Sequence, residues 1–143
     1  MKYQIFFIIV LFLSCFSNFS WAAETKDGVN HIELAAVMLK DGHHDRALLA
    51  LQSVDLGDKK TDLTRFYTLQ GLAYMGLNDL EAAKDSLQLA IKNGQKDPAI
   101  YIYLAQSYFG LKDYQKTIDA IQKAGKKKKK NPSLLSMKAE SYW

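Results

Sequence analysis

The sequence of 143 residues contains a single cysteine, Cys15. Because Cys15 lies in an amino-terminal segment that we expect to be removed, the rest of the chain has no thiol for a disulfide or a thiolate metal site. A domain without such links must be held together by its core. An apolar content of 48% and a charged content of 24% suit one ordinary folded domain.

Groups that carry catalysis are also scarce. No Ser/His/Asp arrangement and no glycine-rich phosphate loop is visible, and the only histidines are His31, His43 and His44. Neighbours such as His43 and His44 point in different directions on a regular element and fall in a turn. We interpret His43, His44 and Asp45 as a solvated turn, with metal ligation as the less favoured alternative. We predict that the protein is not an enzyme and binds no cofactor or metal.

No apolar run is long enough to span a bilayer. The run from Ile5 to Phe16 is shorter than the ~20 residues that a membrane span needs. It follows Lys2 and precedes Ser20-Trp21-Ala22, as in a signal peptide that is cut after Ala22. We predict a cleaved signal peptide at residues 1–22 and a flexible leader at 23–27.

From this segment we predict that the protein is exported to the periplasm or the cell envelope. One alternative is an uncleaved leader that anchors the chain in a membrane, and another is a secreted protein. Phe12-Leu13-Ser14-Cys15 faintly resembles a lipoprotein box, but Phe12 stands where such boxes usually carry leucine. We therefore favour simple cleavage over lipidation.

The basic excess of the chain is local. The formal net charge is +4, from 19 basic and 15 acidic residues. Five of the basic residues form the run Lys126–Lys130 and a sixth is Lys2, which leaves 13 basic residues against the 15 acidic ones. We therefore expect no nucleic-acid partner. The lysine run is interpreted as a solvated helix end, and a weak contact with an anionic envelope surface is the alternative.

An internal repeat organises the chain. Shifting residues 64–97 forward by 34 positions superimposes aromatic, small and turn residues on residues of the same kind. The matched pairs are Tyr67 with Tyr101, Gly71 with Ala105, Tyr74 with Tyr108, Gly76 with Gly110, Asp79 with Asp113, Leu87 with Ile121 and Ala90 with Ala124. This period and these residue types are typical of tetratricopeptide repeats, and residues 28–143 resemble an exported bacterial-type member of that family.

The resemblance implies an all-α fold, a right-handed solenoid of antiparallel helix pairs. Repeats are expected at about 28–61, 64–97 and 98–131, followed by the first helix of a fourth repeat at 132–143. The first copy is looser, because Met38 replaces the aromatic residue and about two extra residues lie in 55–62. The structural positions are expected at Tyr67, Gly71, Tyr74, Ala83, Ala90, Tyr101, Ala105, Tyr108 and Ala124.

Helix ends are marked by residues that cap or stop helices. We predict that the second copy starts at Asp62 or Thr64, and that Asp79 caps its second helix. Asp97 and Pro98 should begin the third copy, with a first helix at about 98–110, since proline is tolerated in a first helical turn.

The family also implies a concave groove along the first helix of each pair. Its positions in this sequence are Ile32, Leu39, Arg65, Thr68, Leu72, Met75, Ile102, Gln106 and Phe109. In this scheme the large apolar residues of the groove are not needed for core packing, so they should form an exposed apolar strip, of the kind that marks binding sites. These residues are Leu39, Leu72, Met75, Ile102 and Phe109.

We expect the groove to bind an extended peptide or a partner helix. A covering terminus or further repeats are the alternative. Some family members bind a chaperone's terminal carboxylate through lysine and asparagine, but Thr68, Leu72, Ile102 and Gln106 offer no such clamp. The leading hypothesis is a protein-binding adaptor of the cell envelope. The alternative is the amino-terminal solenoid of a larger outer-membrane exporter or receptor, of the polysaccharide-export or phage-receptor type. An enzyme accessory domain ranks last. Self-association through the last helix is also expected.

Overall fold

The computed structural model describes residues 30–125 and 132–142, which form seven helices and no strand. The helices are α2 (His31–Lys40), α3 (His44–Gln52), α4 (Leu63–Gly76), α5 (Leu80–Lys92), α6 (Ile100–Gly110), α7 (Tyr114–Lys123) and α8 (Pro132–Glu140). The predicted all-α fold is confirmed. The expected signal peptide, leader and lysine run lie outside the described residues, and none of the described helices is long and apolar enough to cross a membrane.

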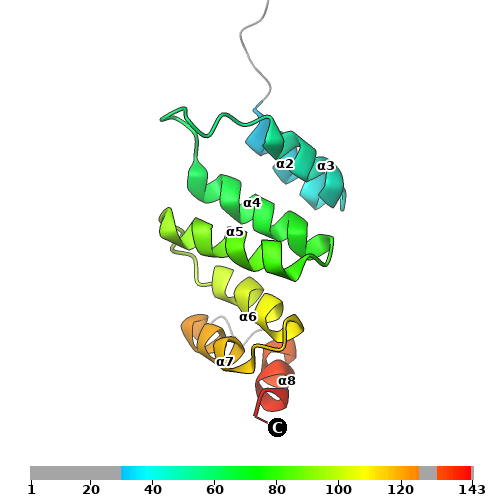
Figure 1. The fold of residues 1–143 in the computed structure, drawn as a ribbon, viewed down its shortest axis with the longest axis vertical. Coiled ribbons are helices and arrows are strands. Elements are labelled where there is room, and N and C mark those ends of the chain that lie inside the picture. The colour runs from blue at the N-terminus through cyan, green and yellow to red at the C-terminus, as the bar shows by residue number, and fades with distance from the viewer. Residues whose placement is uncertain (1–29, 126–131, 143) are drawn as a thin grey trace, which may run out of the picture.

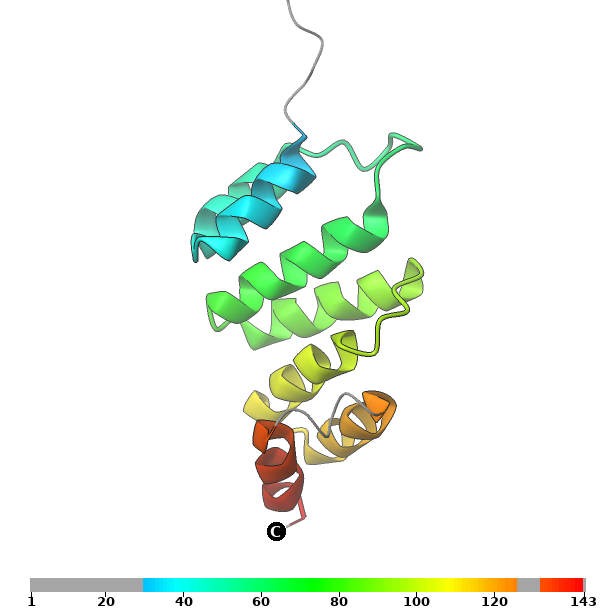
Figure 2. The same ribbon diagram turned by 180° about the vertical axis from the view of Figure 1, so that it is seen from behind.

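The helices stack in chain order along the long axis of the molecule (Figure 1). Each helix packs against the next one in the sequence, which gives the pairs α2–α3, α4–α5 and α6–α7, followed by α8. The first helices of successive pairs also touch, α2 with α4, α4 with α6 and α6 with α8. Figure 2 shows these first helices following one another from one end of the molecule to the other. The chain is therefore a solenoid of helix pairs.

The turn inside each pair has the same construction three times. Gly42, Asn78 and Lys112 take positive φ angles of 79°, 60° and 62°. The N–H of each of these residues, and that of the next residue, donates to a carbonyl of the preceding helix at 2.8–3.1 Å, as in a Schellman motif. The turns are separated by 36 and then by 34 positions. The first copy is thus two residues longer, as expected, and the additional residues lie in the connection between α3 and α4.

Aspartates begin three of the helices. The carboxylates of Asp62, Asp79 and Asp113 each accept the backbone N–H three residues further on, at 2.9–3.2 Å. Of the two caps proposed for α4, the structure uses Asp62. The hydroxyl of Thr64 instead donates to the carbonyl of Asn93, at the end of α5.

Helix α6 starts two residues later than predicted. The carboxylate of Asp97 accepts the N–H of Ala99 at 3.0 Å, so this residue does organise the start. However, the N–H of Ile100 donates to the carbonyl of Asp97 at 3.1 Å and that of Tyr101 to Pro98 at 3.2 Å. These three-residue spacings form a tight 3₁₀-type turn before the α-helix begins.

Small residues let the helices of a pair approach closely. A Cβ atom at Gly71 would lie 2.7 Å from Leu87 Cγ and 3.3 Å from the carbonyl oxygen of Ala83, so α4 meets α5 there without a side chain of its own. The other predicted small positions are also completely buried, namely Ala83, Ala90, Ala105 and Ala124.

The predicted aromatic positions fill the space between the pairs. Tyr108 is buried, while Tyr67, Tyr74 and Tyr101 are half-buried. Tyr67 packs against both of the hydrophobic clusters that form the core, one around α2–α4 and the other around α5–α8. It therefore joins the first repeat to the rest of the solenoid.

Candidate binding groove

The nine predicted groove residues all lie on the first helices of the pairs. Arg65 is exposed and the other eight are half-buried. They come from α2, α4 and α6, which follow one another along the face seen in Figure 2. The predicted groove residues therefore lie on first helices that contact one another, α2 with α4 and α4 with α6.

The groove is less exposed than the sequence suggested. Leu39 packs against the hydrophobic cluster around α2–α4, and Met75 and Ile102 pack against the cluster around α5–α8. The expectation that these three side chains are not needed for core packing is therefore wrong. The physical reason is the direct contact of α2 with α4 and of α4 with α6, which turns inner-face residues into interface residues. Ile32 packs on the first cluster in the same way.

Leu72 and Phe109 are the apolar groove residues outside those two clusters. Both are half-buried. The Phe109 ring meets the Tyr114 ring edge-on, with 6.1 Å between the ring centroids. The expected apolar strip is thus reduced to separate apolar side chains on α4 and α6.

The polar groove residues behave differently from one another. The Thr68 hydroxyl donates to the carbonyl of Thr64 at 2.7 Å and accepts from the side-chain amide of Gln95 at 3.2 Å. Gln95 lies in the connection between α5 and α6, so these bonds hold that connection against α4. By contrast, the half-buried amide of Gln106 makes no hydrogen bond within the described residues. It is the polar group of the groove that has bonding capacity left for a ligand.

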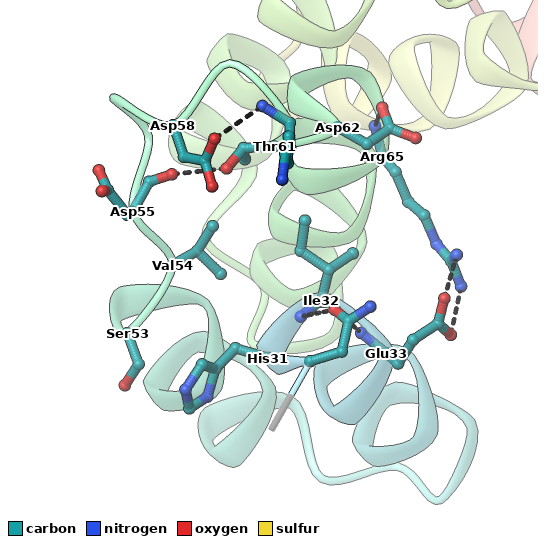
Figure 3. A pocket seen from close by; sticks show the side chains of 12 residues that line it. His31, Ile32, Glu33, Ser53, Val54, Asp55, Asp58, Thr61, Asp62 and Arg65 are labelled. Carbon is teal, nitrogen blue, oxygen red and sulfur yellow. Dashed lines mark hydrogen bonds and ion pairs between the residues drawn. The ribbon is translucent and has the colours of Figure 1, made fainter. Parts of the chain in front are cut away.

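A pocket of about 310 Å³ lies at the amino-terminal ends of α2 and α4. Figure 3 shows Ile32 and Arg65, two of the predicted groove residues, among the side chains that line it. The Arg65 guanidinium makes a two-pronged ion pair with Glu33, one arm of which measures 2.7 Å. This pair links α2 to α4. Sequence reasoning missed Glu33, although its charge opposite Arg65 was the available signal.

The connection between α3 and α4 also lines this pocket. Its acidic side chains bond to their own backbone: Asp55 accepts the N–H of Gly57 at 2.8 Å, and Asp58 accepts that of Lys60 at 2.9 Å. The Thr61 hydroxyl donates to the carbonyl of Asp55 at 2.6 Å, which closes the loop on itself. Across residues 30–125 and 132–142, no group of His, Cys, Asp and Glu side chains has the geometry to hold a metal ion. Apart from Ile32 and Val54, the residues that line the pocket are polar.

One helix pair matches a known family. Residues 64–93, which span all but the first residue of α4 and the whole of α5, match the tetratricopeptide repeat family. This helix pair is a tetratricopeptide repeat. Among curated proteins, none matches the chain. Tetratricopeptide repeats generally mediate protein–protein interactions, and the family is a non-catalytic scaffold type.

The tetratricopeptide framework explains a histidine that the sequence interpretation misplaced. His44 is not a solvated turn residue, because it is the half-buried first residue of α3 and its ring packs against Gly76. A Cβ atom at Gly76 would overlap that ring. Leu80 and Gly110 repeat the same contact one repeat later. The position is therefore a packing position between repeats, filled by histidine in the first copy and by leucine in the second.

The histidine leaves a polar atom without a partner. Nδ1 of His44 is buried and forms no hydrogen bond with any residue that the structure describes. Because an unsatisfied buried group destabilises the fold, we predict that His44→Leu, which copies Leu80, increases the free energy of unfolding by about 1 kcal/mol. Urea denaturation followed by circular dichroism measures this change. His43→Leu is the matched control, since His43 is exposed and should change stability little. An equal gain from both substitutions, or a loss from His44→Leu, would refute the explanation.

Proposed function

We propose that the protein is an interaction scaffold that binds a peptide or a partner helix along α4 and α6. The observation that carries this proposal is the half-buried residue Gln106, whose amide forms no hydrogen bond within residues 30–125 and 132–142. Gln106 shares α6 with Phe109, and α6 contacts α4, which carries Leu72. An amide can donate to and accept from a peptide backbone. The two apolar side chains supply contact area, Phe109 from α6 and Leu72 from α4. A few polar groups among apolar ones are typical of ligand-binding sites.

The polar pocket beside Arg65 extends the surface toward the amino-terminal end. Because Glu33 already neutralises Arg65, this end of the groove has no strong preference for an anionic ligand. We therefore assign binding to side-chain shape and backbone hydrogen bonds rather than to capture of a carboxylate. The absence of a cationic clamp at Thr68, Leu72, Ile102 and Gln106 agrees with this assignment.

A photoactivatable residue tests the groove directly. Replacing Leu72 with p-benzoylphenylalanine should give crosslinks to a partner protein in cells, because the side chain lies within the proposed contact. Replacing Leu49, which is 61% exposed on α3, provides the control outside the groove. Adding Gln106→Ala to the Leu72 variant should weaken the crosslinked band. Equal crosslinking from positions 72 and 49, or a band indifferent to Gln106→Ala, would contradict the proposal.

We further propose that the scaffold works in the cell envelope, as the leader pattern of residues 1–22 suggests. The alternative, an amino-terminal solenoid of a larger outer-membrane exporter or receptor, would also be located in the cell envelope. The protein recovered from an envelope fraction should begin at Ala23, because Ser20-Trp21-Ala22 provides the small residues of a cleavage site. Amino-terminal sequencing checks this. A protein that begins at Met1, or one acylated at Cys15, would contradict cleavage after Ala22.

Self-association is a second candidate function, and helix α8 favours it. In α6, Ala105 is completely buried and Tyr108 is 8% exposed. Their equivalents one repeat later are open, since Ala139 of α8 is exposed and Tyr142, in the turn just after α8, is 63% exposed. Leu135 is exposed as well. The surface that α7 covers on α6 thus has no cover on α8 within the described residues, and exposed apolar faces of this kind tend to associate.

We therefore expect the 143-residue chain to form dimers or larger species at micromolar concentration. Sedimentation velocity measures the distribution of species. Leu135→Ser combined with Tyr142→Ser should shift it toward monomer, because these changes remove the apolar contact area. The pair Val37→Ser and Leu49→Ser, at exposed positions of the opposite end, is the control. A wild-type chain that sediments only as monomer would rule the idea out.

A further inference from the structure

A second cleft lies between α5, α6 and α7. Its volume is about 340 Å³. On α6 it is lined by Tyr101, Leu104 and Tyr108, which form a helical stripe different from that of Ile102, Gln106 and Phe109. Its walls come from α5 and α7, neither of which carries a predicted groove residue. The cleft is therefore separate from the groove, and a ligand bound there is independent of the proposed function.

The floor of the cleft is apolar. The floor is formed by Leu104 from α6 and Ala120 from α7, each of which is 4% exposed. The side-chain amide of Gln88 donates to the Tyr108 hydroxyl at 2.6 Å, which ties α5 to α6. The polar groups of the floor are thus engaged, and the remaining surface suits an apolar side chain.

The α7 edge of the cleft carries two cations. Lys116 Nζ lies 5.6 Å from the centre of the Tyr108 ring, and Lys123 Nζ lies 5.8 Å from that of Tyr101. They are two helical turns apart, a rise of roughly 10 Å. Lys116 pairs with Asp113 at 2.7 Å, and this hydrogen bond raises the pKa of Lys116. Lys123 makes no ion pair with any residue that the structure describes.

One carboxylate also lines the cleft. Asp119 lies on α7 between the two lysines and accepts a hydrogen bond from the Gln115 side chain at 3.3 Å. The charged residues that line the cleft are therefore two lysines and one aspartate. The net charge of the lining is +1, and it becomes zero when Asp113, the ion-pair partner of Lys116, is counted. Lys116 uses one of its three N–H donors on Asp113, and Lys123 makes no ion pair with a described residue. The α7 edge therefore keeps cationic N–H donors that can bind an anionic ligand.

The repeat itself supplies an internal comparison. Moving back 34 positions along the chain, Lys116 corresponds to Ala82 and Lys123 to Leu89, both on α5. The helix pair therefore forms without lysine at either position. Because Tyr101 matches Tyr67 in the same register, the tyrosine belongs to the shared framework, whereas the lysines are particular to this cleft.

The floor differs between the repeats in the same way. Leu104 corresponds to Gln70 and Ala120 to Ser86. In the earlier pair, the Ser86 hydroxyl donates to the Gln70 side chain at 3.1 Å, which bridges α5 and α4. The later pair replaces this polar bridge by two apolar residues. The apolar floor and the lysines at its edge thus occur together in one repeat. The earlier repeat forms its helix pair without these residues at the matching positions.

We propose that the cleft between α5 and α7 binds an acidic peptide segment of a partner protein. An aliphatic or aromatic side chain of the segment rests on Leu104 and Ala120, and carboxylates roughly 10 Å apart pair with Lys116 and Lys123. In a polyproline-type segment, residues three apart lie on one side with a spacing of roughly 9 Å. The spacing suits acidic residues at positions i and i+3 with an apolar residue between them.

A fluorescent ten-residue peptide with a Glu-Leu-Pro-Glu centre tests this proposal. Its affinity for the full chain is measured by fluorescence anisotropy at low ionic strength. Lys116→Ala with Lys123→Leu copies the residues of α5 and should fold normally. Two exposed charge pairs together are worth about tenfold in affinity, so we expect that loss. Lys40→Ala with Lys59→Ala removes the same charge from exposed positions elsewhere and should leave affinity within twofold.

A second variant tests the floor. Leu104→Gln with Ala120→Ser recreates the polar bridge of the earlier repeat and keeps both lysines, so it should weaken binding of the same peptide at least threefold. Circular dichroism confirms that each variant is folded. The proposal fails if the wild-type chain does not bind the peptide, or if a peptide with glutamine in place of glutamate binds equally well. The proposal also fails if the Lys116/Lys123 variant and the Lys40/Lys59 variant lose the same affinity for the peptide, since the attraction would then be non-specific. Full affinity of the floor variant for the peptide would overturn it as well.

Discussion

The structure depends on how closely its helices approach. Gly71 brings α4 against Leu87 and the backbone of α5, and Ala105 occupies the equivalent position of α6 with no exposure. Because the axes lie close, the side chains next to each contact are forced outward between the pairs, where Tyr67 joins the two core clusters. The small residues thus decide the spacing, and the spacing decides which larger residues can pack.

Because the small residues set the helix spacing, some other positions are free to vary. At the contact between successive repeats, His44 on Gly76 and Leu80 on Gly110 do the same work with different chemistry. Ala82 and Leu89 on α5 correspond to Lys116 and Lys123 on α7, and both segments are helices. A repeat protein acquires its binding surfaces at such positions, because changes there cost little stability.

Much of the fold could be predicted from the sequence. A 34-residue register located the small contacts, and Asp79 and Asp113 could be recognised as caps because capping is a local interaction. The site was less predictable. Leu39, Met75 and Ile102 carry the same apolar character whether a face is open or covered, so nothing local distinguishes them from Leu72 and Phe109. Their burial results from contacts between the first helices of neighbouring repeats.

The sequence by itself determined the helix pairs, their order and the small residues at which they meet, since periodicity, capping and turn chemistry act over a few residues. Only the tertiary structure decided how open each surface is. The Glu33–Arg65 pair joins residues on α2 and α4, and the cleft of α5, α6 and α7 combines side chains from three helices. Such arrangements depend on distances between helices, and spacing along one chain does not specify them.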